Sequence, residues 1–138
     1  MGDILAVNQI HNQDMSISRL LIYMKSIQQL DEPKSISKEL ADELLACAPK
    51  RRSIRMERIF YSVIMKYPDG VTVRDIDVMF NPEYKIDVLK ILISVRKRKK
   101  YYVIWPGRYE DGKLIYGEEG FPDYKVYNIA DYDITFVK

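Results

Sequence analysis

The sequence has little of the residues from which disulfides and metal sites are built. Its 138 residues include one cysteine, Cys47, and one histidine, His11. A single cysteine excludes a disulfide within the chain and a cysteine-based metal cluster from one copy. We therefore expect no metal or other cofactor, and a reducing, cytoplasmic location. Because His11 stands in a polar stretch without a neighbouring nucleophile, neither enzyme activity nor a small-molecule substrate is expected.

Long apolar runs, glycine and proline are also scarce. No run approaches the roughly 20 apolar residues that cross a bilayer, so a membrane partner is not expected. Six glycines and six prolines against 47% hydrophobic residues exclude a low-complexity chain and favour a folded one. We expect an N-terminal helical arm over residues 1–50, packing on the domain or on a partner subunit, and one domain over residues 51–138.

Acidic and basic residues are unevenly distributed, although the formal net charge is only +2. Residues 1–50 contain 5 basic and 7 acidic side chains, residues 51–100 contain 13 and 6, and residues 101–138 contain 4 and 7. The three segments therefore carry −2, +7 and −3. A basic middle between acidic ends is typical of a surface that faces a polyanion, and a solvated charge run gives the same pattern.

Apolar spacing predicts five helices, over Ser16–Leu30, Ser35–Ala48, Ser53–Tyr67, Val73–Phe80 and Pro82–Lys97. The third is the most amphipathic, with apolar and arginine-bearing sides. The last is apolar on almost every side and follows Asn81, a suitable N-cap. Its β-branched residues also allow a strand. The first and last helices offer more apolar surface than one short core needs, which predicts a homodimer.

Strand patterns are concentrated in the second half of the chain. A short strand is expected at Val71–Val73, followed by Tyr101–Pro106 and Lys113–Tyr116. Asp111-Gly112 suits a tight hairpin turn, because glycine accepts a positive φ without steric cost. Another strand is expected over Tyr124–Ile129. The predicted fold class is therefore α+β and mainly helical, with N-terminal helices, a small C-terminal antiparallel sheet and a buried Trp105.

From Ser53 onward, the order helix, short strand, helix, helix, strand, hairpin, strand resembles the winged helix-turn-helix family of DNA-binding domains. The resemblance implies that the Pro82–Lys97 helix enters the major groove and that the Tyr101–Ile129 region forms the wing. It implies DNA contacts from three groups of residues. These are Tyr84, Lys85 and Lys90 on the helix, Arg96, Lys97, Arg98, Lys99 and Lys100 at its end, and Arg108 and Lys113 on the wing.

A second, overlapping frame also resembles a helix-turn-helix. Its first helix is Ser37–Ala48 and its second begins near Arg52. DNA contacts would then come from the front of the second helix, through Arg51, Arg52, Arg55 and Arg58, since arginine binds phosphate or guanine with two hydrogen bonds. The alternative for these arginines is ion pairing with Glu57, Asp42 or Glu43. Both frames remain open at this point.

The resulting functional hypothesis is a homodimeric protein that binds double-stranded DNA and regulates transcription or replication. One alternative is an interaction module that docks onto a larger nucleic-acid machine, because Glu83, Asp87, Glu110 and Asp111 place acids on the predicted reading helix and wing. A remote alternative is a metal-dependent nuclease, because Pro68-Asp69 and Glu83-Tyr84-Lys85 resemble the PD and ExK elements of such enzymes.

Overall fold

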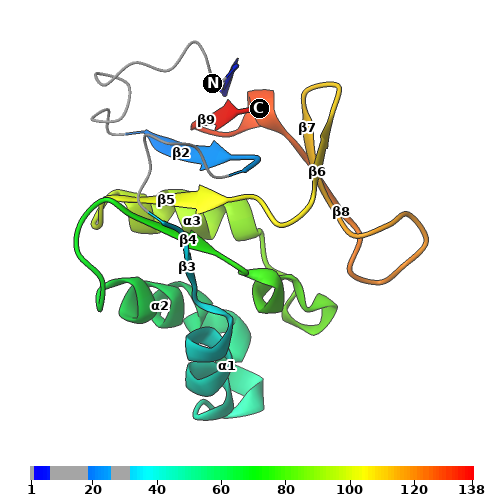
Figure 1. Ribbon diagram of the computed structural model, residues 1–138. Coiled ribbons are helices and arrows are strands. Elements are labelled where there is room, and N and C mark those ends of the chain that lie inside the picture. The colour runs from blue at the N-terminus through cyan, green and yellow to red at the C-terminus, as the bar shows by residue number, and fades with distance from the viewer. Residues whose placement is uncertain (1, 7–18, 26–31) are drawn as a thin grey trace.

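The computed structural model describes residues 2–6, 19–25 and 32–138, and its centre is a six-stranded parallel sheet (Figure 1). The strand order is β1-β9-β2-β5-β4-β3. The first three strands in the sequence lie before residue 50 and the other three after it, so both parts of the chain build this one sheet. The bounds are β1 Asp3–Leu5, β2 Leu20–Tyr23, β3 Lys34–Ser35, β4 Val71–Arg74, β5 Tyr101–Ile104 and β9 Ile134–Val137.

Strand β2 replaces part of the helix expected over Ser16–Leu30, and that prediction is wrong for residues 20–23. Residues 16–18 and 26–30 of the predicted helix lie outside the described residues. The reason is burial on both faces of the strand. Leu20 and Ile22 enter the main core, whereas Leu21 and Tyr23 enter a second cluster on the other face. A parallel strand that is covered on both faces is apolar at every position. In a run of only four residues, the spacing of apolar side chains cannot distinguish such a strand from part of a buried helix.

The mainly helical winged helix-turn-helix fold is also wrong, because the parallel sheet dominates the structure. The decisive strand is β5, expected to belong to the wing. It pairs in parallel with β2 and β4 instead of joining the hairpin. The order of elements along the chain is similar in the two folds, but helices between parallel strands act as crossover connections. Sequence order does not determine which strands pair.

The helices occupy two of these crossovers and lie on one face of the sheet (Figure 1). Helices α1 (Ser37–Leu45) and α2 (Arg52–Ile64) connect β3 to β4, and α3 (Val88–Arg96) lies between β4 and β5. The expected helices over Ser35–Ala48 and Ser53–Tyr67 are thereby confirmed. Their apolar sides meet the sheet, with Leu40, Phe60 and Leu92 fully buried. Among the described residues no helix is long and apolar enough to cross a membrane.

The two later helix predictions need correction. The region expected as a helix over Val73–Phe80 is the end of β4 followed by a 3-10 turn at Asp77–Phe80. The expected helix over Pro82–Lys97 is divided by Lys85, whose φ of 51° is left-handed. Pro82–Tyr84 forms a 3-10 turn capped by Asn81, and α3 begins only after Asp87, whose carboxylate accepts from the Lys90 amide at 3.1 Å. Asp87 is therefore a helix cap and not part of a reading surface.

A three-stranded antiparallel sheet stands beside the main sheet (Figure 1). It contains β6 (Arg108–Glu110), β7 (Lys113–Tyr116) and β8 (Lys125–Asn128). The strands expected at Lys113–Tyr116 and Tyr124–Ile129 are confirmed, but β7 forms its hairpin with β6 and not with the expected Tyr101–Pro106 strand. Asp111 and Gly112 both have positive φ, 47° and 78°, as a two-residue hairpin turn requires. Trp105 is buried as expected, and its indole nitrogen donates to the Ile115 carbonyl at 3.1 Å. Further 3-10 turns lie at Pro49–Arg51 and Ile129–Asp131.

Candidate functional site

Helix α2 separates an apolar side from an arginine-bearing side. Met56, Phe60 and Val63 are fully buried, whereas Arg55 and Arg58 are exposed. Ile54 lies on the arginine side and 86% of its surface is exposed. The position follows from the helical repeat, because residues four apart share a face. An isoleucine at this position contributes almost nothing to the core, which makes it a candidate for contact with another molecule.

A groove of about 230 Å³ runs between the end of α1 and the exposed side of α2. It is lined by Glu43, Ala46, Cys47, Arg55, Arg58, Ile59 and Ser62. A second hollow of about 370 Å³ adjoins it across Arg58 and is lined by Ile54, Glu57, Arg58, Tyr61 and Arg98. We call the surface formed by these two sets of residues the α1–α2 face. It combines an apolar floor with a row of arginines.

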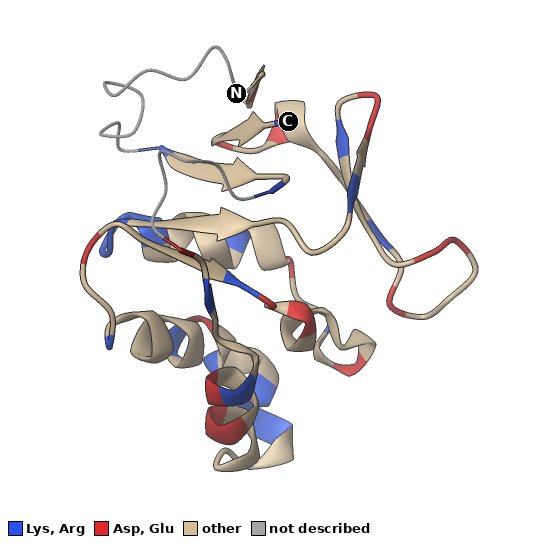
Figure 2. Ribbon diagram, in the orientation of Figure 1, with Lys and Arg blue, Asp and Glu red and all other residues tan. Residues whose placement is uncertain are grey.

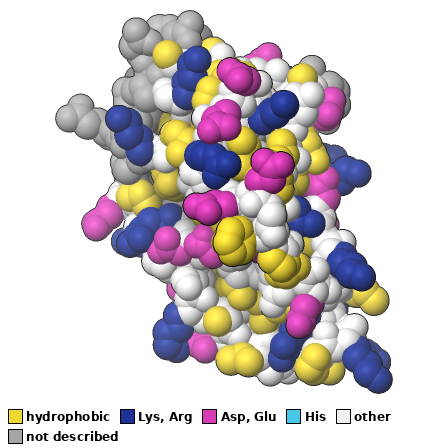
Figure 3. All heavy atoms as spheres, turned by 90° about the vertical axis from the view of Figure 1, so that its right-hand side faces the viewer, with side chains coloured by type: hydrophobic (Ala, Val, Ile, Leu, Met, Phe, Trp, Pro, Cys, Tyr) yellow, Lys and Arg dark blue, Asp and Glu magenta, His cyan; other side chains and the backbone are white. Residues whose placement is uncertain are grey.

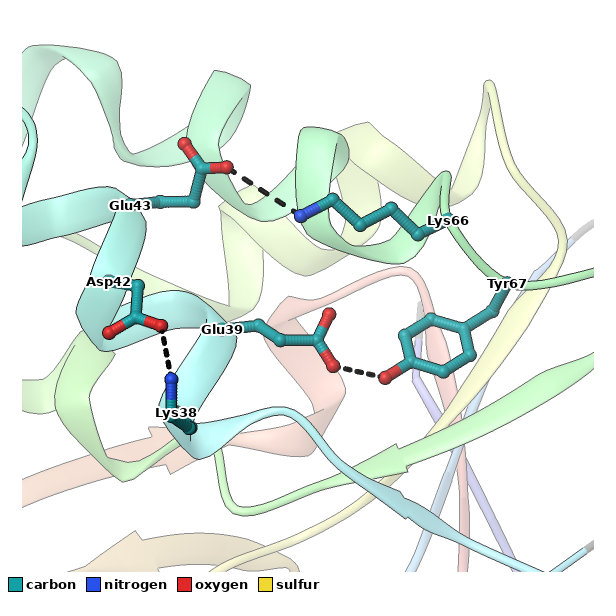
Figure 4. Close-up of polar contacts among 6 residues, drawn as sticks. All are labelled: Lys38, Glu39, Asp42, Glu43, Lys66 and Tyr67. Atoms are coloured by element: carbon teal, nitrogen blue, oxygen red, sulfur yellow. Dashed lines mark hydrogen bonds and ion pairs between the residues drawn. The ribbon is translucent and has the colours of Figure 1, made fainter.

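The acids on α1 already have partners (Figure 4). Glu43 pairs with Lys66 at 3.8 Å and Asp42 with Lys38 at 2.7 Å. The hydrogen bond from Lys38 to Asp42 raises the pKa of this lysine. Glu39 accepts a hydrogen bond from the hydroxyl of Tyr67. These contacts pair the carboxylates of α1 with Lys38 of the same helix and with Lys66 and Tyr67, which follow α2.

Several arginines at and after the start of α2 have no acidic partner among the described residues. Glu57, the acid closest to them in the sequence, pairs with Arg98 at 3.3 Å. Within residues 2–6, 19–25 and 32–138, the side chains of Arg51, Arg55 and Arg58 form no ion pair or hydrogen bond. The expected alternative of pairing with Asp42, Glu43 or Glu57 is therefore not realised. Three guanidinium groups on this helix remain available to a ligand.

The charges at the start of α2 do not serve the stability of the helix. Its first turn contains no acid, Arg51 is the N-cap, and no side chain caps the helix. The N-terminal end of a helix carries positive partial charge, so each cation there costs about 0.3–1 kcal/mol where it is not screened. Arg52 alone has a structural role, since its Nε donates to the carbonyls of Leu44 at 2.7 Å and Cys47 at 3.2 Å.

The residues of the basic run at the end of α3 differ in burial and in contacts. Lys99 is buried, with its Nζ 2.6 Å from the Tyr67 carbonyl and 2.9 Å from Asp69. That hydrogen bond and charge lower the pKa of Asp69. Arg98 lies over the Tyr61 ring, 4.3 Å from its centroid, and joins the α1–α2 face. Arg96 and Lys100 are half-buried, and Lys97 is exposed.

The other predicted DNA contacts do not gather on this face. Tyr84 is buried, Lys85 and Lys90 are exposed, and none of the three lines the two hollows. Arg108 and Lys113 lie on the antiparallel sheet, away from α1 and α2 (Figure 2). Arg108 pairs there with Glu110 at 3.4 Å and donates to the Gly117 carbonyl at 2.9 Å. The structure brings together Arg55, Arg58 and Arg98 from the predicted set.

The two carboxylates of the nuclease alternative have other surroundings. Asp69 is exposed in the turn before β4 and pairs with Lys99, and Glu83 is exposed in the 3-10 turn after Asn81. In the part of the chain that the structure describes, no group of three histidine, cysteine or acidic residues could hold a metal ion. The absence of activity remains a prediction.

No family model, curated protein or solved structure matches this chain. The α1–α2 face is therefore interpreted from its own chemistry. Sequence analysis identified its arginines but missed Ile54, Cys47 and Tyr61 as parts of the same surface. The signal for Ile54 was present, because its spacing from Arg58 places it on the arginine side of the helix.

Proposed function

We propose that the protein is a docking module whose α1–α2 face binds an acidic, amphipathic segment of a partner protein. The observation that carries this proposal is the position of the 86% exposed Ile54 beside Arg55 and Arg58, whose charges no described residue neutralises. Apolar side chains of the partner would occupy the groove floor. Its carboxylates would meet the guanidinium groups at the rim.

Burial of the apolar residues supplies the expected driving force. Covering one fully exposed isoleucine contributes about 1.5–3 kcal/mol. The groove floor adds Ala46, Cys47 and Ile59. Leu45, the residue before Ala46, is itself 73% exposed. Contiguous exposed apolar surface is typical of interaction sites.

The kind of cation also favours a protein partner. The cations that line the two hollows are arginines, Arg55, Arg58 and Arg98, without a lysine. Protein interfaces are enriched in arginine and tyrosine and depleted of lysine, because a planar guanidinium is less strongly hydrated and pairs with a carboxylate through two hydrogen bonds. Tyr61, under Arg98, adds an aromatic surface.

Double-stranded DNA remains a prediction that this face supports less well. Glu43 and Glu57 line the same hollows as the arginines, and a phosphate backbone presents negative charge along its whole length. An aliphatic floor gives no base-edge hydrogen bonds. A protein segment can place apolar residues against the floor and carboxylates only where the arginines lie.

The test is fluorescence anisotropy with a labelled, short acidic peptide that carries leucine and phenylalanine one helical turn apart. We expect Ile54→Ser and Arg58→Ala each to weaken its binding by about tenfold or more, the loss typical of a central interface residue. Lys113→Ala is the matched control, because it removes an exposed cation on the far sheet and should leave binding unchanged.

The same titration with a duplex DNA of random sequence, at low salt, separates the two classes of partner. Binding to DNA that Ile54→Ser leaves intact, without binding to the peptide, would overturn the docking proposal. The proposal would also be overturned if the peptide bound the Ile54→Ser and Arg58→Ala variants as tightly as the unaltered protein. Loss of peptide binding in both variants, with each variant folded by circular dichroism, would support it.

A further inference from the structure

The loop between β7 and β8 is an acidic segment that carries an exposed aromatic ring. Its sequence from Gly117 to Tyr124 is GEEGFPDY, with Glu118, Glu119 and Asp123 around Phe121. Phe121 is 61% exposed. Figure 3 shows the molecule from the side on which this loop lies, where acidic and hydrophobic side chains lie close together and basic side chains lie among them. This loop has the chemistry expected of a ligand for the α1–α2 face.

Hydrogen bonds hold the loop in one conformation. The Phe121 amide donates to the Glu118 carbonyl and the Tyr124 amide to the Phe121 carbonyl, both at 3.1 Å. The guanidinium of Arg108 donates to the Gly117 carbonyl at the base of the loop, at 2.9 Å. A segment that is already ordered loses less conformational entropy when it binds than a flexible one.

The loop and the α1–α2 face lie in different parts of the molecule. In Figure 1 the loop, drawn in orange, extends away from the sheet on the right, whereas α1 and α2 lie at the bottom and left. In this structure the loop does not occupy the groove of its own chain, because Phe121 is exposed and does not line the groove. Two different surfaces that complement each other on the same chain give a head-to-tail contact between copies.

Charge and size match between the two surfaces. The loop contributes three carboxylates, and the groove offers Arg55 and Arg58, while the groove's Glu43 is paired with Lys66 at 3.8 Å. The groove volume of about 230 Å³ is larger than the roughly 150 Å³ of an enclosed protein cavity that admits benzene, so a phenyl ring is not too large for it. The apolar floor of Ala46, Cys47 and Ile59 suits such a ring.

We propose that the partner of the α1–α2 face is a second copy of this chain, whose Phe121 enters the groove while Glu118 and Glu119 pair with Arg55 and Arg58. This inference rests on the proposed docking function and names its ligand. The contact uses different surfaces on the two copies, so one copy keeps a free groove and the other keeps a free loop. Association therefore continues to a ring or an open chain instead of ending at a symmetric dimer.

Sedimentation velocity of the full chain over a wide concentration range tests the assembly, at about 50 mM and about 500 mM salt. The expected result is an average mass that grows with concentration and falls at high salt. Phe121→Ser, which removes the loop's anchor, and Arg58→Glu, which reverses a groove charge, should each remain monomeric. Lys113→Glu, a charge reversal at the end of β7 farther from the loop, should assemble like the unaltered protein.

Mixing the two monomeric variants is the decisive arm. Arg58→Glu keeps its loop and Phe121→Ser keeps its groove, so the mixture should form a one-to-one dimer and nothing larger. An unaltered protein that stays monomeric at low salt, or a mixture without dimers, overturns the inference. If in that case the acidic peptide still binds through Ile54 and Arg58, the docking function stands and only the identity of its partner is wrong. If the peptide fails as well, both proposals fall.

Discussion

At the residue scale, Lys99 illustrates how a cation in a basic run can be structural. Its side chain is 7% exposed, and its Nζ donates to the Tyr67 carbonyl at 2.6 Å, which ties the end of α3 to the segment after α2. The second partner, Asp69, is itself exposed. Lys97, two residues earlier, is exposed and has none of these contacts among the described residues. The sequence presents both lysines alike, and only the fold distinguishes them.

We predict that Lys99→Met lowers the free energy of unfolding by about 1–3 kcal/mol, because it leaves the partly buried Tyr67 carbonyl without its donor. Lys97→Met, which makes the same chemical change at an exposed position, should alter it by no more than about 0.5 kcal/mol. Urea denaturation followed by circular dichroism measures both values. Equal midpoints for the two variants would show that the Lys99 contacts contribute nothing to stability.

At the scale of elements, aromatic contacts attach the antiparallel sheet to the main sheet. Phe80 stacks on Tyr116 with ring centroids 3.9 Å apart, and Trp105 meets Tyr127 edge to face at 5.8 Å. Burial, together with the nearby carboxylate of Asp77, raises the pKa of Tyr116 to about 12. Burial and the charge of Asp87 raise the pKa of Tyr127 to about 12 as well. The docked sheet therefore favours the neutral phenols.

The raised tyrosine pKa values predict that the folded state loses stability at alkaline pH. Free tyrosine has a pKa of about 10, so above that pH the unfolded chain loses protons that the folded chain retains. The stabilisation is complete below about pH 10 and is lost as the pH rises toward 12. We predict that the emission of Trp105, the only tryptophan, shifts to the red in this window. Tyr116→Phe removes an ionising group and should move the midpoint upward, and an unchanged midpoint would refute the role of Tyr116.

Local sequence patterns predicted some of these elements and not others. The amphipathic helix α2, the hairpin turn at Asp111-Gly112 and strand β8 were predictable, because each depends on local spacing or on a local φ requirement. Strand β2 was not predictable, and for the expected strand at β5 the partners were not, since Leu20–Tyr23 and Tyr101–Ile104 are short apolar runs whose partners are distant in the sequence. The division of the Pro82–Lys97 helix was also missed, because nothing local announces the left-handed Lys85.

The candidate site was predictable in charge but not in shape. A net charge of +7 over residues 51–100 indicated where the arginines of the candidate site come from. It could not indicate that Lys99 is buried or that Glu57 forms an ion pair with Arg98. Nor could it indicate that Ala46 and Cys47 form a groove floor beside Arg55. Those features depend on how α1, α2 and α3 pack, which is a property of the whole fold.

At the scale of the whole molecule, strand β2 links the two parts of the chain that sequence analysis divided at residue 50. It lies between β9 and β5, and the Tyr23 carbonyl accepts from the Trp105 amide at 2.8 Å. Ile22, in the middle of the strand, is fully buried. Because β2 is interior to the sheet, unfolding it exposes the neighbouring strands, and the sheet should unfold in one cooperative step.

We therefore predict that Ile22→Ala, a change before residue 50, lowers the unfolding midpoint reported by Trp105 fluorescence, which lies after it. The expected loss is about 2–5 kcal/mol, as for a large-to-small change in a core. Ile4→Ala in the edge strand β1, where the side chain is exposed, is the matched control and should have a small effect. If residues 1–50 were an independent arm, circular dichroism would record the destabilisation of Ile22→Ala while the Trp105 transition stayed in place. A coincident shift of both signals would instead assign the N-terminal strands to the same folding unit as the groove and the loop, so that both proposed binding surfaces depend on one cooperative core.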